Sequence, residues 1–125
     1  MRAIGLGLLS LFLWAGLPGG AAMASDAEVV AVKITPQGQD HYQFDVTVRH
    51  PDTGWDAYAD RWEVLAPDGS VLGTRVLAHP HVDEQPFTRS LGGVAIPAEI
   101  EEVTVRARDS VDGWGSVTMT LPVPR

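Results

Sequence analysis

Apolar and polar residues alternate along most of the chain after about residue 28, which is the period of a β-strand with one buried and one solvated face. The clearest example is His41–Arg49, in which Tyr42, Phe44, Val46 and Val48 fall on one face and polar residues on the other. No segment after residue 24 shows the 3.6-residue period of an amphipathic helix. The pattern therefore predicts an all-β protein.

Seven segments have this alternation, and sequences rich in Gly, Pro and Asp separate them. The predicted strands are Glu28–Thr35, His41–Arg49, Arg61–Leu65, Val71–Leu77, Phe87–Leu91, Glu102–Arg108 and Ser116–Leu121. Short strands at about ten-residue spacing are typical of an antiparallel β-sandwich. We expect residues 25–125 to form one such domain of about seven strands.

The alternation also predicts which side chains of each strand enter the core. In the third strand Trp62 and Val64 are expected to face inward, and in the fourth strand Val76. In the last strand the inward positions include Val117 and Met119.

The first 24 residues have the layout of a cleavable signal peptide. Arg2 precedes an apolar run, Ile4–Leu17, and a stretch of small residues ends in Ala22-Met23-Ala24. The alternative is an uncleaved membrane anchor, but the apolar run is shorter than the ~20 residues that span a bilayer. We therefore expect cleavage after Ala24 and a periplasmic or secreted protein.

The charge and the cysteine content of the chain exclude several classes of binding partner and of covalent modification. Without Arg2 the chain has eight basic residues against 16 acidic ones, so we expect it to bind neither nucleic acid nor anionic lipid. It contains no cysteine, which excludes disulfides, thiol catalysis and a lipid-modified cysteine. We accordingly expect no stable membrane anchor after cleavage. The absence of Asn, together with the short leader, indicates a bacterial protein.

The segment Val103–Leu121, VTVRARDSVDGWGSVTMTL, resembles the last hairpin of bacterial immunoglobulin-like and fibronectin type III-like domains. Trp62 is similar to the core tryptophan of immunoglobulin domains. The sequence departs from these families because it lacks the inter-sheet disulfide and the tyrosine corner. The resemblance implies an immunoglobulin-like sandwich and no particular activity.

Antiparallel strands would bring three loops to one end of such a sandwich: Pro51–Asp60, His79–Gln85 and Asp109–Gly115. Loops at one end of a rigid scaffold commonly form binding sites. Exposed aromatic residues would supply large contact areas there for a protein, peptide or glycan. The candidate partner-binding residues are Trp55, Tyr58, Asp83, Glu84, Asp112 and Trp114.

The two loop tryptophans could instead fold back and cover the core. We expect this for Trp55, because Gly54 would let its loop turn tightly, and leave both roles open for Trp114. Asp109 and Asp112 precede Gly113, which faintly matches a calcium loop, but an Asx-type turn in a hairpin is the favoured interpretation.

A metal site is the alternative function for this end. His79 and His81 would extend two imidazoles to one side, and His50 could add a third, a ligand set that suits zinc or copper. Otherwise these histidines are ordinary polar loop residues, and we expect no cofactor.

No catalytic motif is present, neither a G-x-S-x-G elbow nor H-E-x-x-H nor a phosphate-binding loop. The chain is therefore predicted to be a non-catalytic binding or structural module. Arg106 and Arg108 are expected to face outward beside Glu63, and a cross-strand ion pair with Glu63 is favoured over an anion site.

Overall fold

The computed structural model describes residues 25–125, so the predicted signal peptide lies outside the described part of the chain. Within that part the fold is all-β, as predicted, and contains no helix that could cross a membrane. The strands are β1 (Ser25–Gly38), β2 (His41–Arg49), β3 (Ala59–Leu65), β4 (Val71–Val76), β5 (Phe87–Ala95), β6 (Glu102–Asp109), β7 (Gly113–Val117) and β8 (Met119–Pro122).

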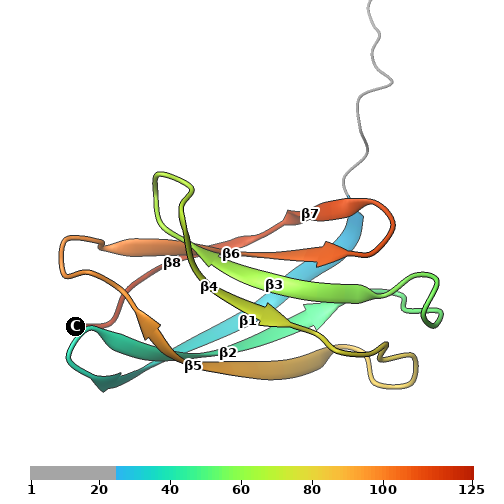
Figure 1. Cartoon of the computed structure of the whole chain (residues 1–125), viewed down its shortest axis with the longest axis horizontal. Helices are drawn as coiled ribbons and strands as arrows, with labels where there is room; N and C mark the ends of the chain where they lie inside the picture. The colour runs from blue at the N-terminus through green and yellow to red at the C-terminus, as the bar shows by residue number, and fades with distance from the viewer. Residues whose placement is uncertain (1–24) are drawn as a thin grey trace, which may run out of the picture.

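The strands form one continuous sheet, which corrects the prediction of two separate antiparallel sheets. The hydrogen-bonded order is β4-β3-β6-β7-β1-β2-β5. Strand β8 also pairs with β6, along the first residues of β6, whereas β7 pairs with its last residues. The sheet curves until its two end strands nearly meet (Figure 1). Gly73 of β4 faces Leu91 and Val94 of β5 there, and a Cβ on Gly73 would lie 3.0 Å from Leu91 Cδ2.

A parallel pairing between β1 and β7 joins the two halves of the sheet and makes it mixed. Ser25 pairs with Gly115, and Glu28 pairs with Val117. The backbones approach so closely that a Cβ on Gly115 would lie 1.8 Å from the carbonyl oxygen of Ala27. Only glycine leaves room for this contact. The alternation of apolar and polar residues in the sequence does not predict it.

The predicted last strand is divided into β7 and β8 at Thr118. Glycine-rich β7 lies between β6 and β1, whereas β8 pairs along the start of β6. Val117 lies where the chain changes partners and is 46% exposed, so its predicted inward position was wrong. Val76, at the end of the sheet's terminal strand β4, is also exposed rather than inward.

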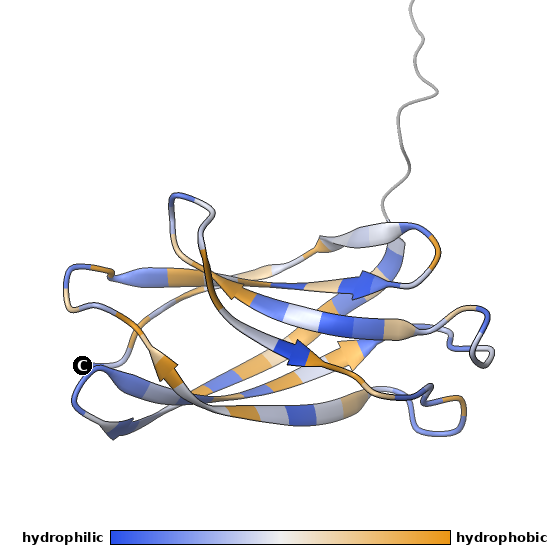
Figure 2. Ribbon diagram, viewed as in Figure 1, coloured by the Kyte–Doolittle hydropathy of each residue, from blue (hydrophilic) through white to orange (hydrophobic). Residues whose placement is uncertain are grey.

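The core follows the predicted alternation elsewhere. All four apolar residues of β2 are buried, as are Trp62 and Val64 of β3, and Figure 2 shows hydrophobic and hydrophilic residues alternating along the strands. The largest fully buried side chains are Trp62, Phe44, Phe87, Ile96, Val29, Val46, Val48, Val64, Val103 and Val105.

Three loops gather at one end of the molecule, as predicted, on the right in Figure 1. We call residues 50–58, 77–86 and 110–112 the loop end. They connect β2 to β3, β4 to β5 and β6 to β7 respectively.

Replacing Gly115 with Ala should destabilise the protein, because the new methyl group would push the β1 backbone away from β7. Overpacking of this kind costs about 1–3 kcal/mol or more. Thermal unfolding measures the loss. Gly92→Ala is the control, since its Cβ would meet only the flexible Gln37 side chain, at 3.4 Å. Equal unfolding midpoints for the two variants would contradict the role of the β1–β7 contact.

Candidate functional site

A buried histidine lies at the base of the loop end. The His50 side chain is 4% exposed, and its two ring nitrogens face different carboxylates. Nδ1 lies 2.6 Å from Asp52 Oδ1, and Nε2 lies 3.0 Å from Asp109 Oδ2. An ionised carboxylate only accepts hydrogen bonds, so a ring nitrogen that bonds to one donates to it. His50 is therefore held between two buried aspartate carboxylates, one at each ring nitrogen.

Asp52 follows the end of β2 and connects two of the loops. Its Oδ1 also accepts the backbone N–H of Ala59, and its Oδ2 accepts the N–H of His81 at 2.7 Å. The carboxylate is fully buried, and these bonds satisfy both of its oxygens. One side chain thereby fixes the start of β3 and the loop between β4 and β5.

Asp109 is the last residue of β6, and its side chain bonds to the third loop, residues 110–112. Its Oδ1 accepts the N–H groups of Val111 and Asp112, which is the predicted Asx-type turn. Burial by itself would raise the pKa of Asp109. The hydrogen bonds from the Asp112 and Val111 amides and from His50 outweigh it and hold that pKa below its usual range.

Further hydrogen bonds link the same loops. The His50 N–H donates to Gln85 Oε1, and Gln85 Nε2 donates to the carbonyl of His81. Tyr58 and Ser110 exchange two bonds: Tyr58 N–H donates to Ser110 Oγ, and Ser110 N–H donates to the Tyr58 carbonyl. The loop end is consequently one hydrogen-bonded unit.

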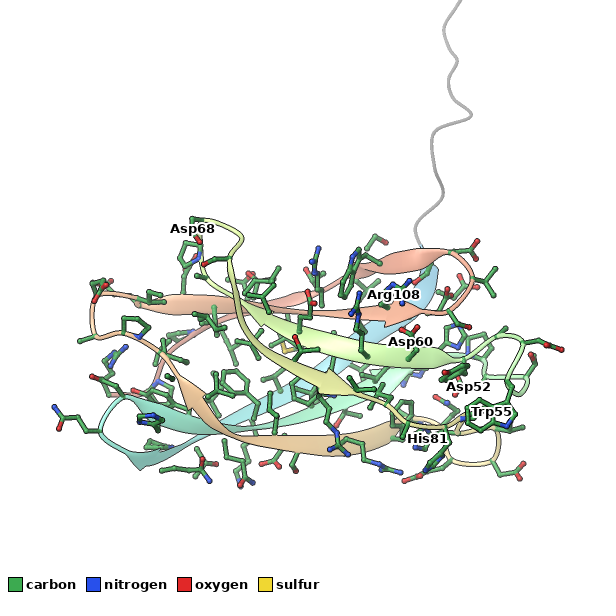
Figure 3. All side chains as sticks on the ribbon, in the orientation of Figure 1. Asp52, Trp55, Asp60, Asp68, His81 and Arg108 are labelled. Atoms are coloured by element: carbon green, nitrogen blue, oxygen red, sulfur yellow. The ribbon has the colours of Figure 1, made fainter. Side chains whose placement is uncertain are left out.

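The loop tryptophan Trp55 points outward, contrary to the expectation that it covers the core. Its side chain is 68% exposed. It occupies the corner of a four-residue turn in which Ala57 N–H bonds to the Gly54 carbonyl, so the flexible glycine directs the ring away from the domain. Figure 3 shows Trp55 at the loop end. Its ring packs edge-on against Tyr58, with 5.6 Å between centroids.

A pocket of about 300 Å³ opens beside Tyr58, between the start of β3 and the ends of β4 and β6. Its polar wall contains Asp60 and Arg108, which form an ion pair of 2.7 Å. Arg61 also lines the pocket, and Val76 and Leu77 are among its apolar residues. Within residues 25–125 Arg61 has no carboxylate partner.

Trp114, the other candidate tryptophan, lies on the sheet rather than at the tip of a loop. The guanidinium of Arg106 lies 3.7 Å from its ring centroid, and that of Arg61 lies 5.4 Å away. Arg106 also bonds Glu63 at 2.9 Å, which confirms the predicted cross-strand ion pair. Trp114 is thus already covered by an arginine of this chain.

The structure places two of the three candidate metal ligands side by side. The rings of His79 and His81 have centroids 4.7 Å apart, whereas both nitrogens of His50 face carboxylates. His81 stacks on Phe87 at 4.0 Å. Burial, and then the nearby Arg89, lower the pKa of His81. No group of three or more His, Asp or Glu side chains in the described chain is arranged to hold a metal ion.

The candidate acids Asp83, Glu84 and Asp112 are exposed at the tips of their loops. Arg89 donates to Glu84 at 3.1 Å, and this hydrogen bond is the main cause that lowers the pKa of Glu84. These acids lie outside the buried network, so they remain accessible to a partner.

Sequence reasoning placed His50, Asp52 and Asp109 at the same end but did not recognise them as a triad. The spacing His50-Pro51-Asp52 directly after a strand was the available signal for one contact. Asp109 is 59 residues from His50, and no local pattern connects them. The pocket residues Asp60 and Arg61 were missed for the same reason.

Comparison with known proteins gives one informative match. A protein described as "Putative lipoprotein" from Halomicrobium mukohataei is 38% identical over 96 residues, which cover 77% of this chain and 47% of that protein. The chain therefore spans about half the length of this relative. No protein-family model matches the chain, and no solved structure does.

Replacing His50 with Ala should strongly destabilise the protein, because it removes the side chain that the buried carboxyl groups of Asp52 and Asp109 both contact. Removing one partner of a buried ion pair costs about 3–5 kcal/mol. Denaturant unfolding at pH 7 measures the effect. His79→Ala, which removes an exposed imidazole from the same end, should change stability by much less; equal losses would contradict the triad.

Stability should fall at acidic pH partly through Asp109. Because folding lowers its pKa, Asp109 stabilises the native state above the ordinary aspartate pKa of about 3.9. That contribution is lost as the pH falls through the lower, folded-state pKa. Asp109→Asn should therefore show a smaller loss of unfolding free energy between pH 5 and the acid limit than the unaltered protein. An unchanged acid slope would contradict this assignment.

Proposed function

We propose that this chain is an exported, non-catalytic recognition module that binds a protein, peptide or glycan through its loop end. The exposed Trp55 is the observation that carries the proposal. Trp55 is 68% exposed and packs against Tyr58 on a turn at the hydrogen-bonded loop end. An exposed aromatic side chain on such a turn is typical of a residue that contacts a partner. The pocket beside Tyr58 adds a concave surface with both polar and apolar walls.

The proposed scaffold is immunoglobulin-like. Strands β1, β2 and β5 lie together, and β3, β6 and β7 lie together, which matches the grouping of the corresponding strands in immunoglobulin sandwiches. The fourth strand differs from the constant-type arrangement because it pairs with β3 rather than joining β1, β2 and β5. Fibronectin type III-like domains remain the more specific resemblance that we infer.

Export is supported by two independent observations. Residues 1–24 have the composition of a signal peptide, and the relative from Halomicrobium mukohataei carries the description "Putative lipoprotein". Because these 125 residues contain no cysteine, a cysteine-linked lipid cannot be attached within them. We therefore propose a periplasmic or secreted location for the domain itself.

The absence of catalysis is supported by how the reactive groups are used. In the hydrolase arrangement a histidine contacts a serine hydroxyl on one side and a carboxylate on the other. His50 contacts carboxylates on both sides, and Ser110 Oγ accepts a hydrogen bond from the Tyr58 amide. Neither group is arranged as a base or a nucleophile.

Replacing Trp55 with Ala should weaken partner capture by roughly thirtyfold, the loss typical of an aromatic hot spot worth about 2 kcal/mol. The immobilised protein would be used to capture binders from the envelope fraction of its source organism, over a dilution series. Val71→Ala is the matched control, since Val71 is 50% exposed at the opposite end. Capture that survives Trp55→Ala, or that falls equally with Val71→Ala, would place the binding surface elsewhere.

A further inference from the structure

The tips of the loop end present a set of exposed apolar side chains, one from each loop. Trp55, Val82 and Val111 are 68%, 51% and 62% exposed. Among the described residues the remaining large exposed apolar side chains, those of Val71, Val76 and Val117, lie on strands. Exposed apolar side chains on neighbouring loops at one end of a protein are typical of an interaction surface.

The three loops that carry these side chains are acidic. Residues 50–58, 77–86 and 110–112 contain no lysine or arginine. Each loop instead carries an exposed aspartate, namely Asp56, Asp83 or Asp112, and none of the three forms an ion pair within residues 25–125. The unpaired carboxylates are therefore available to positive charges from outside.

We propose that the partner of the loop end is a basic protein segment that carries apolar side chains beside its Lys or Arg residues. This inference rests on the proposed function and names the partner's chemistry. Apolar contact would come from Trp55, Val82 and Val111, and the three aspartates would pair with the partner's cations. Complementary charge between two surfaces sets both the rate and the specificity of their association. Like-charge repulsion by the same carboxylates excludes nucleic acids and acidic proteins.

The buried triad favours binding because it limits what the loops lose on association. Ordering a loop upon binding consumes binding free energy. In this domain Asp52 and Asp109 already hold the three loops through His50 and through backbone amides. The apolar and acidic side chains at the tips are thus presented on a prearranged base.

A random twelve-residue peptide library, displayed on phage and selected on the full chain as exported, tests the proposal without a known ligand. The selected peptides should contain Lys or Arg next to apolar residues, and their binding should weaken as salt is raised. A variant that neutralises one acid per loop should bind them roughly tenfold more weakly, since it removes three exposed ion pairs that each contribute modestly. That variant is Asp56→Asn/Asp83→Asn/Asp112→Asn.

The control variant changes the net charge equally at the opposite end, in the connection from β5 to β6 and at the first residue of β6. It is Glu99→Gln/Glu101→Gln/Glu102→Gln, and all three of these residues are exposed. It should retain the affinity of the unaltered chain. Equal losses in the two triple variants would reduce the effect to overall charge and overturn the proposal.

The remaining outcomes separate this inference from the proposed function. Selected peptides that lose binding with Trp55→Ala but lack basic residues would overturn the basic partner and leave recognition by the loop end intact. Peptides that bind independently of both Trp55 and the three aspartates would overturn both. A library that yields no enriched peptide would also overturn the basic-segment proposal.

Discussion

A histidine held between two buried carboxylates is the interaction on which the loop end depends. His50 lies between Asp52 and Asp109, and the remaining oxygen lone pairs of the two aspartates accept backbone amides of the surrounding loops. Burying polar and ionisable groups is costly unless each of them is hydrogen-bonded. The arrangement meets that condition, and the same hydrogen bonds also fix three loops that are distant in sequence.

The loop end thus combines a buried polar base with an exposed tip of a different character. Its base contains the hydrogen-bonded histidine and aspartates, whereas its tip carries exposed apolar side chains such as Trp55 and the unpaired acids. This separation is what a recognition surface requires, because the supporting contacts need not be broken when the tip is covered. The curved sheet supplies the rest: the contact of β1 with β7 at Gly115 joins its two halves below the loops.

Sequence pattern was sufficient where a structural property repeats locally. Alternation in His41–Arg49 identified a strand and its buried face, and antiparallel connection placed the three loops together. It was insufficient where the outcome depends on distant backbone geometry. The space that Gly115 leaves for Ala27 is visible only once β1 and β7 are adjacent. The charge partners of His50 come partly from β6, and Trp55 faces outward because a four-residue turn forms around it.

Amide hydrogen exchange of the unaltered protein shows whether the buried triad holds the three loops as one unit. The diagnostic amides are those of Ala59, His81, Val111 and Asp112, which donate to the two aspartates. All four should be protected to a similar degree although they lie in or beside loops, because they open together. Rapid exchange of these amides, at the rate of the exposed loop tips, would contradict it.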